Sequence, residues 1–202
     1  MKKFEFDGKT KEEAIEKALT ELKVNEKDLI VNILEEKSSL LKKSVKIEVI
    51  NYNDLIDFIK ETIIEITKLM GLSVNLEVRR REENITIKIF SDHNAVLIGR
   101  NGKVLEALQT IVRQIIQKET KEFISVILDV ENYKDKRIKN LEYLAKKVAK
   151  EVANTKVETK LDSMNSYERR IIHSVLTDNK YVYTESVGEE PNRCVVIKPK
   201  DE

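Results

Sequence analysis

Two glycines, three residues apart, constrain this 202-residue chain more than any other feature. Gly99 and Gly102 separate two stretches, residues 94–98 and 103–118, in which apolar side chains recur at helical spacing. The chain has only five Gly and two Pro, so it uses glycine sparingly. A pair of glycines at this place lets the backbone turn tightly between two helices. The sequence therefore predicts two consecutive helices joined by a very short loop.

The loop between these helices has the chemistry of a phosphate site. Glycine has no Cβ to hold a phosphate away from the main chain. A helix that starts at Lys103 offers free N–H groups and a positive end to an anion, and Arg100 and Lys103 add charge beside it. An ordinary link between two helices, with a glycine that ends the first, explains the same tetrapeptide. The four residues alone leave both interpretations open.

The elements around the loop follow a regular order. Residues 54–70 have the apolar spacing of a helix, and residues 74–78 and 85–89 alternate as the two strands of a hairpin. A further strand is predicted over residues 124–130. The order from residue 51 to residue 131 is therefore helix, strand, strand, helix, helix, strand.

Three consecutive arginines, Arg79 to Arg81, fall between the two strands of the predicted hairpin. With Glu82, Glu83 and Asn84 they predict a charged turn. A solvated surface is the simpler interpretation, because the two glutamates partly neutralise the arginines. Salt-sensitive attraction of nucleic-acid phosphates is the alternative.

The chain on either side of this segment has its own patterns. Residues 1–50 predict a strand, a helix and two strands, with a polar link over residues 35–44. Residues 132–202 predict a long helix, a short strand, a second helix and two more strands. We therefore expect an α+β protein of three small domains, residues 1–50, 51–131 and 132–202.

A second candidate site lies on the helix predicted over residues 166–176. Arg169 and His173 are four residues apart and share one face of that helix, while Ile172 belongs to another face that suits a core. A guanidinium makes paired hydrogen bonds to a phosphate, and an imidazole adds one donor. A solvent-facing polar stripe, or an ion pair of Arg169 with Glu168, is the simpler explanation of the spacing alone.

The order of elements around the glycine pair resembles that of a KH domain of the second topological type, α-β-β-α-α-β. This resemblance implies a loop that clamps the sugar-phosphate backbone of single-stranded RNA or DNA beside an apolar groove for the bases. The residues implied to contact RNA are Ile98, Gly99, Arg100, Asn101, Gly102 and Lys103. Ile98 and the strand over residues 85–89 would line the groove or form the core beneath it, and the sequence does not separate these two roles.

Residues 164–173 and 184–193 resemble an R-three-H domain, a small α/β domain with an antiparallel sheet that is named for an Arg and a His separated by three residues. Arg169 and His173 match this motif. The resemblance implies that both residues contact single-stranded nucleic acid. Arg193, near the end of the chain, would extend the same positive surface.

Residues 6–15 resemble the start of a Jag N-terminal domain, so that nearly the whole chain resembles the Jag/KhpB family of bacterial proteins. This resemblance implies a cytoplasmic RNA chaperone or post-transcriptional regulator that influences cell elongation, division and envelope homeostasis. It also implies a small separate KH protein of the KhpA type as partner, or a homodimer. The alternative is an adaptor whose N-terminal domain recruits a membrane or division partner, with RNA binding secondary.

Composition argues against other classes of protein. Lys and Arg number 37 and Asp and Glu 36, which excludes a wholly basic coating protein. One cysteine, Cys194, and two histidines give neither a disulfide framework nor a metal cage. We therefore expect no enzymatic activity and no cofactor. We also expect no secretory signal, because Phe4-Glu5-Phe6-Asp7 follows the first two lysines in place of an apolar run. No membrane insertion is expected either, since no apolar stretch approaches the ~18 residues of a membrane span.

Overall fold

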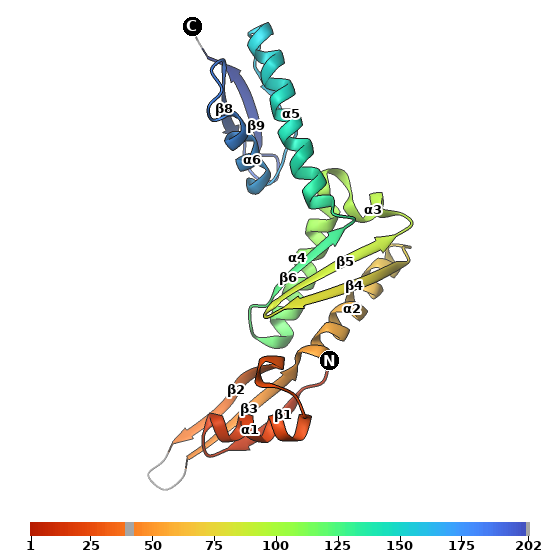
Figure 1. Ribbon diagram of the computed structural model, residues 1–202, viewed down its shortest axis with the longest axis vertical. Coiled ribbons are helices and arrows are strands. Elements are labelled where there is room, and N and C mark those ends of the chain that lie inside the picture. Colours follow the sequence, from red (N-terminus) through yellow and green to blue (C-terminus); the bar gives the residue numbers. More distant parts are fainter. Residues whose placement is uncertain (39–42, 201–202) are drawn as a thin grey trace. The chain divides into compact units, whose positions relative to one another are not determined.

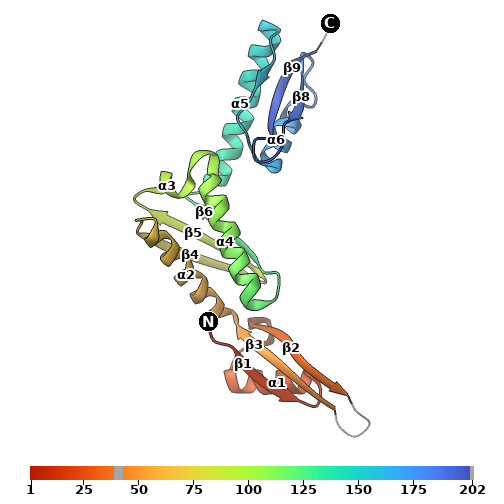
Figure 2. The same cartoon turned by 180° about the vertical axis from the view of Figure 1, so that it is seen from behind.

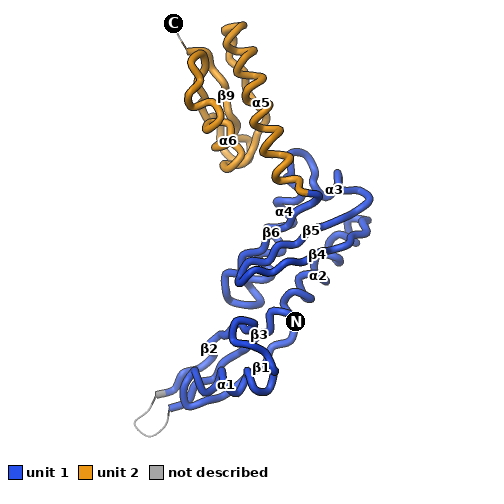
Figure 3. Tube along the Cα trace, in the orientation of Figure 1, with its two compact units in different colours: residues 1–131 blue, residues 132–202 orange. Residues whose placement is uncertain are grey.

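The structure of the chain, a computed structural model, describes residues 1–38 and 43–200. These residues form two units, residues 1–131 and residues 132–202 (Figure 3). Both units combine helices with small three-stranded sheets, so the predicted α+β class is confirmed. Each unit is described by itself below.

The first part of unit 1 has the predicted order of strand, helix, strand, strand. Its elements are β1 (Phe4–Gly8), α1 (Lys11–Leu22), a 3₁₀ turn (Glu26–Asp28), β2 (Leu29–Ser38) and β3 (Lys43–Asn51). The sheet order is β1-β3-β2, with both pairs antiparallel. Thr10 caps α1 by accepting a hydrogen bond from the Glu13 N–H at 3.3 Å. Ala14 and Ala18 of α1 are buried against Ile47 and Val49 of β3.

The polar link predicted over residues 35–44 is wrong over most of its length. Strand β2 continues to Ser38 and β3 begins at Lys43, with Lys37 opposite Ser44 in the ladder. Polar residues can extend a two-stranded arm because neither of its faces has to form a core. The remaining part of the link, residues 39–42, lies outside the described residues.

The second part of unit 1 has the predicted order α-β-β-α-α-β. Its elements are α2 (Tyr52–Leu69), β4 (Val74–Arg81), β5 (Asn84–Ser91), α3 (Asn94–Ile98), α4 (Lys103–Thr120) and β6 (Ser125–Val130). The sheet order is β4-β5-β6, with β5 antiparallel to β4 and parallel to β6. Helices α2 and α4 lie on the same face of this sheet (Figure 1 and Figure 2).

The charged turn predicted over residues 79–84 is much shorter in the structure. The hairpin ladder continues through Arg79, Arg80 and Arg81, and only Glu82 and Glu83 form the turn. Glu82 has a left-handed backbone with φ of 54°, which a two-residue hairpin turn requires. The arginines therefore belong to β4, and alternate side chains point to opposite faces of the strand.

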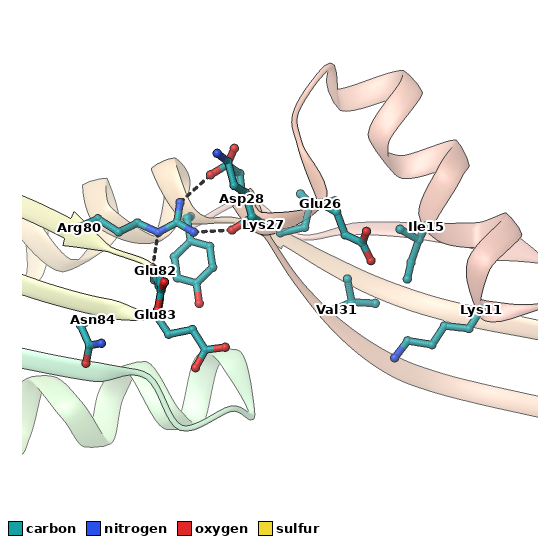
Figure 4. Close-up of a pocket in the computed structure, with 12 residues that line it drawn as sticks. Lys11, Ile15, Glu26, Lys27, Asp28, Val31, Arg80, Glu82, Glu83 and Asn84 are labelled. Atoms are coloured by element: carbon teal, nitrogen blue, oxygen red, sulfur yellow. Dashed lines mark hydrogen bonds and ion pairs between the residues drawn. The ribbon is translucent and has the colours of Figure 1, made fainter.

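Arg80 joins the two parts of unit 1 (Figure 4). Its Nη1 donates to Asp28 Oδ1 at 2.7 Å, its Nε donates to the Glu82 carbonyl oxygen at 2.8 Å, and its Nη2 donates to the Lys27 carbonyl oxygen. The guanidinium also stacks on the Tyr52 ring, 3.7 Å from the ring centroid. The ion pair between Arg80 and Asp28 lowers the pKa of the Asp28 carboxyl, chiefly through the hydrogen bond from Arg80.

A second contact between the two parts is buried. Asn32 Nδ2 of β2 donates to the carbonyl oxygen of Thr120, at the end of α4, over 2.8 Å. In addition, β3 ends at Asn51 and α2 starts at Tyr52, with Asn51 as the N-cap. The described residues of 1–131 thus hold together as one unit, and the domain boundary predicted near residue 50 stays a prediction.

Unit 2 contains α5 (Tyr133–Thr155), β7 (Thr159–Lys160), α6 (Ser166–Leu176), β8 (Val182–Val187) and β9 (Cys194–Pro199). Its sheet has the order β7-β9-β8 and is antiparallel throughout, as predicted. Helices α5 and α6 pack against the sheet, and the core forms between them. The buried residues of α5 are Leu141, Ala145, Val148, Ala149 and Val152. Ile172 of α6 is buried as predicted, and Leu176 of the same helix is buried as well.

Candidate nucleic-acid interface

The loop between α3 and α4 owes its shape to three left-handed residues. Gly99, Asn101 and Gly102 have φ angles of 68°, 54° and 78°. Only glycine adopts such angles at no cost, and Asn tolerates them better than most other residues. The sequence Gly-Arg-Asn-Gly is thus suited to this turn at every position that needs positive φ.

Packing against α4 is a second reason why position 99 requires glycine. A Cβ at this position would lie only 2.3 Å from Cγ2 of Val104. Gly102 is buried and is the N-cap of α4, so no cap side chain bonds the first turn of that helix. The glycines therefore bring bare main chain to the start of an 18-residue helix, which is the arrangement that favours an anion.

The side chains around the loop divide into a buried anchor and an accessible rim. Leu97 is fully buried and fixes α3, whereas Val96 is 50% exposed and Ile98 is half-buried. Arg100 and Lys103 are both exposed. The loop thus presents two cations and an aliphatic edge on one short segment.

The strand next to the loop forms the core and not the surface of a groove. Ile85, Ile87 and Ile89 of β5 have no exposed area. Of the two roles considered for this strand, the core is confirmed. Ile98 differs from these three residues because part of its side chain remains accessible.

Two side chains of α4 bind the backbone of β6, which is an edge strand of the sheet. Arg113 Nε donates to the Val126 carbonyl oxygen at 2.7 Å, and Gln109 Oε1 accepts from the Leu128 N–H at 3.0 Å. An edge covered in this way is protected from pairing with another strand. This role of Gln109 and Arg113 is not predictable from the sequence, because nothing in the pattern of α4 indicates which strand the helix flanks.

Two of the three consecutive arginines are held by protein groups. Arg79 Nη2 pairs with Glu77 Oε1 at 2.7 Å, and Arg80 joins the two parts of unit 1 as described above. Arg81 is exposed. The contacts of Arg79 and Arg80 argue against a nucleic-acid surface, and those of Arg80 also differ from the solvated surface that was the simpler interpretation.

In the second candidate site, the side chain of Arg169 is buried within unit 2. Arg169 is only 7% exposed, and its Nη1 donates to the Met164 carbonyl oxygen and to Glu190 Oε1, both at 2.8 Å. The suggested pairing with Glu168 is wrong, because Glu168 accepts from Arg137 Nε at 2.7 Å. A solvent-facing stripe is also wrong for Arg169, since the side chain is buried.

His173 bridges α6 and β8. Its Nδ1 lies 2.6 Å from Thr184 Oγ1 and its Nε2 lies 2.8 Å from Ser186 Oγ. Burial, and then the nearby Arg169 guanidinium, lower the pKa of the imidazole. The ring is therefore held neutral at neutral pH between two hydroxyl groups, which accept or donate as its tautomer requires.

Arg193, the third residue predicted for this site, is exposed. Its carbonyl oxygen accepts a hydrogen bond from the Met164 N–H at 3.1 Å, which ties the segment before β9 to the segment before α6. Arg169 binds the carbonyl oxygen of the same Met164. The main chain of Met164 thus bonds to both residues, to the side chain of the buried Arg169 and to the main chain of the exposed Arg193.

The partners of Arg169 and His173 were not identified as such from the sequence. Thr184, Ser186 and Glu190 all lie in the stretch that carries the resemblance to an R-three-H domain. The resemblance therefore covered these three residues. Their contacts with Arg169 and His173 could not be predicted, because they depend on how β8 and the segment after it pack on α6.

Neither a metal site nor a membrane-spanning helix occurs among the described residues, 1–38 and 43–200. They contain no cluster of three or more His, Cys, Asp or Glu side chains that could hold a metal ion. None of their helices is both long enough and apolar enough to cross a membrane.

Three family models match consecutive segments of the chain. Their descriptions are Jag N-terminus for residues 6–50, KhpA/KhpB KH domain for residues 54–128, and R-three-H domain for residues 139–199. The matched segments follow the order in which the sequence resembled these three domains.

Curated proteins are similar over most of the chain. RNA-binding protein KhpB of Clostridium symbiosum is 38% identical over 203 residues, which cover 96% of this chain and 90% of that protein. RNA-binding protein KhpB of Bacillus subtilis is 30% identical over 200 residues, 96% of each chain. The protein of the same name from Lactiplantibacillus plantarum is 32% identical over 135 residues, 67% of this chain and 42% of that protein.

Proposed function

Because the chain belongs to the KhpB family of RNA-binding proteins, we propose that it binds single-stranded RNA with the loop between α3 and α4. The observation that carries this proposal is the bare main chain of Gly99 to Gly102 at the start of α4. The start of α4 is suited to a phosphate because it has a positive end and no side chain caps its first turn. Single-stranded DNA has the same backbone charge and is a second ligand of the same kind.

The side chains of the loop supply the remaining contacts. Arg100 and Lys103 are exposed beside the start of α4, where they attract phosphates and add to the positive end of the helix. Asn101 offers amide hydrogen-bonding groups at the tip of the loop. Ile98 contributes an aliphatic surface for a base, because it is only half-buried.

In unit 2 the residues predicted to bind nucleic acid take two different roles in our proposal. Arg169 and His173 are occupied by protein partners, so they shape the surface between α6 and β8. Arg193 is exposed at the border of that surface and is the residue that contacts the strand there.

At the level of the cell, the proposal is an RNA chaperone or post-transcriptional regulator that influences cell elongation, division and envelope homeostasis. It has no enzymatic activity and acts in the cytoplasm, with residues 1–50, 51–131 and 132–202 as its three domains. Its protein partner is a small KH protein of the KhpA type, or a second copy of the chain. The family model that covers the KH domains of both KhpA and KhpB supports a partner of this kind.

An adaptor role is the second candidate function, in which the N-terminal domain recruits a membrane or division partner. The contacts of Arg80 and Asn32 favour it in one respect, because they fasten the N-terminal part to the RNA-binding part of unit 1. A partner held by the first part would then be held close to the RNA.

The test is a change of Asn101 to Asp in the full chain. Asp has the same shape as Asn and also tolerates a left-handed backbone, so the loop should keep its conformation while it gains a negative charge. We expect Kd for a labelled single-stranded RNA to rise about tenfold, on the order of 1.4 kcal/mol. The matched control is Asn53→Asp, which adds the same charge at an exposed position of α2.

Equal affinities of the Asn101→Asp and Asn53→Asp chains would contradict the assignment of the loop. The same pair of variants separates the two functions in cells. A chain that loses RNA affinity but keeps its effect on cell shape would favour the adaptor, and loss of both would favour the RNA-binding regulator.

A further inference from the structure

The exposed face of α5 carries a concentration of positive charge. The whole chain is nearly neutral, with a formal net charge of +1. Residues 132–156, by contrast, contain eight Lys and Arg and only three Asp and Glu. The distribution of these charges around the helix shows where the excess lies.

The lysines gather on the side of α5 that faces away from the core. At 3.6 residues per turn, the side chains within about 60° of Tyr143 form one face. The members of this face, called here the α5 lysine face, are Lys136, Lys139, Asn140, Tyr143, Lys146, Lys147, Lys150 and Asn154, and all are exposed. Asp135, Glu142 and Glu151 lie on its margins, so the face itself has no acidic residue.

These lysines have no structural task that accounts for them. Among the residues that the structure describes, none of the five forms an ion pair or a hydrogen bond through its ammonium group. Other exposed lysines do so: Lys17 pairs with Glu13 and Lys60 with Asp57. The opposite side of α5, with Leu141, Ala145 and Val152, already supplies the packing of the helix.

One aromatic side chain stands in the middle of the α5 lysine face. Tyr143 is 71% exposed, although a tyrosine ring normally gains stability by burial. Cations that follow a strand, with an aromatic ring on which a base can stack, are the two elements of sequence-tolerant binding to single-stranded nucleic acid. From Lys136 to Lys150 the face extends over about 21 Å of helix, at 1.5 Å per residue.

We infer that the α5 lysine face is a further binding surface for single-stranded RNA, in addition to the loop and to the surface between α6 and β8. It holds the strand by its phosphates through the lysines and by one base on Tyr143. The inference rests on the proposed function, because it assumes that RNA is the ligand. Its contribution is independent of sequence, since lysines here meet phosphates and the ring can stack on any base.

An anionic membrane is the other polyanion that such a face could attract. RNA is favoured because the apolar side of α5 is buried in the core of unit 2. A helix that lies in a membrane interface needs that side for insertion into the lipid. The exposed Tyr143 also fits stacking on a base.

The experiment measures binding of a labelled, mixed-sequence single-stranded RNA to the full chain over a range of salt concentrations. The test variant is the triple change Lys139→Gln, Lys146→Gln and Lys150→Gln. The matched control, Lys17→Gln, Lys37→Gln and Lys60→Gln, removes the same charge from exposed lysines of unit 1 that pair with acidic residues. Circular dichroism confirms that both chains are folded.

For a single strand, each phosphate neutralised by a lysine contributes about 0.7 to the magnitude of the slope of log K against log salt, so the loss of three lysines should lower that magnitude by about 2. The ratio of wild-type to variant affinity should then widen roughly 16-fold when salt is lowered fourfold. The control should keep the wild-type slope. Arginine at the same three positions should restore the slope, because it keeps the charge, and Tyr143→Leu should weaken binding without changing the slope.

An unchanged slope and affinity in the triple Gln chain would overturn the inference. If Asn101→Asp still weakens binding in that case, the proposed function stands without the α5 lysine face. If the wild-type chain itself fails to bind RNA, the proposed function fails first. Loss of binding to phosphatidylserine vesicles in a flotation assay, with RNA binding unchanged, would overturn the inference in favour of a membrane.

Discussion

The two sites that the sequence singled out use their basic residues in opposite ways. In the loop of unit 1, Arg100 and Lys103 are exposed, and the backbone of the glycines sets the conformation. In unit 2, Arg169 is buried and binds Met164 and Glu190, while His173 is held between two hydroxyl groups. A basic residue at motif spacing can therefore be exposed at the surface or buried in the framework, and the two cases differ in what its side chain offers to a ligand.

The comparison extends to the other basic segments. Arg80 resembles Arg169, because its guanidinium is occupied by a carboxylate and by carbonyl oxygens. The lysines of the α5 lysine face resemble Lys103 at the loop only in being exposed. Charge alone does not indicate a nucleic-acid surface, because a basic side chain can instead be buried against protein groups, as Arg169 is.

The largest expected effect is a loss of stability on changing Arg169 to Ala. The buried carbonyl oxygen of Met164 would lose its partner, and Glu190 would lose an ion pair that is partly screened because its side chain is 59% exposed. We expect the free energy of unfolding of unit 2 to fall by about 2–3 kcal/mol. Urea unfolding followed by tyrosine fluorescence measures it, because five of the six tyrosines lie in unit 2.

The matched control for Arg169→Ala is its neighbour. Arg170 is exposed on α6, so Arg170→Ala should change the stability by no more than about 0.5 kcal/mol. Equal stabilities of the two variants would contradict the framework role of Arg169, because its contacts would then contribute no more to stability than those of an exposed arginine.

The second expected effect concerns Arg80. Its replacement by Ala removes the contacts with Asp28, Glu82 and Tyr52, and should cost about 1–2 kcal/mol of the stability of unit 1. RNA affinity should stay within a factor of about two, since one partly buried cation is lost away from the loop. Arg81→Ala, at the next and exposed position, is the control for both measurements. A larger loss of RNA affinity for Arg80→Ala than for Arg100→Gln would contradict the assignment of Arg80 to the framework and of Arg100 to RNA binding.

Arg100 should show the opposite behaviour. Arg100→Gln removes an exposed cation beside the start of α4, so its stability should match the wild type within about 0.5 kcal/mol. Its RNA affinity should fall by about 1 kcal/mol, roughly fivefold in Kd, with the salt slope reduced by about 0.7. Fluorescence anisotropy at several salt concentrations checks both values, and a stability loss without an affinity loss would assign Arg100 to the framework.

The smallest effect is a dependence on pH at His173. Its pKa is lowered in the folded chain, so the unfolded chain binds a proton more readily. The stabilising contribution of the neutral ring is therefore present above the ordinary histidine pKa and is lost as pH falls through the lowered value. Unit 2 should lose stability below about pH 6.5, and His173→Gln should flatten this dependence in tyrosine-monitored unfolding. A steeper dependence in the variant would contradict the lowered pKa.

The fold was predictable from the sequence because its signals are local. Period-two alternation located β5, helical spacing located α4, and Gly99 and Gly102 marked the turn between α3 and α4. The ends of strands were predicted less well. The ladder of β4 and β5 includes Arg79 to Arg81, since cross-strand pairing can extend a strand through charged residues that have no strand preference of their own.

The partners of the site residues could not be predicted, because they come from distant positions. Arg169 meets Glu190, 21 residues away, and Arg80 meets Asp28, 52 residues away. Helical spacing gives the face that Arg169 and His173 share, but not whether that face is turned to solvent or to a strand. The surface of α5 shows the converse. The spacing of its lysines can be read from the sequence, but only the structure shows that they share the exposed side of the helix.

The most direct test of RNA binding at the loop is a titration of the ¹⁵N-labelled full chain with a short single-stranded RNA, followed by amide chemical shifts. Large shifts are predicted for the amides of Gly99 to Lys103, where we propose that phosphates contact the main chain. Smaller shifts are predicted for the amides of Arg169 and His173, whose side chains already have protein partners. Saturable binding with unchanged amides from Gly99 to Lys103, and with the largest shifts at Arg169 and His173, would contradict the account.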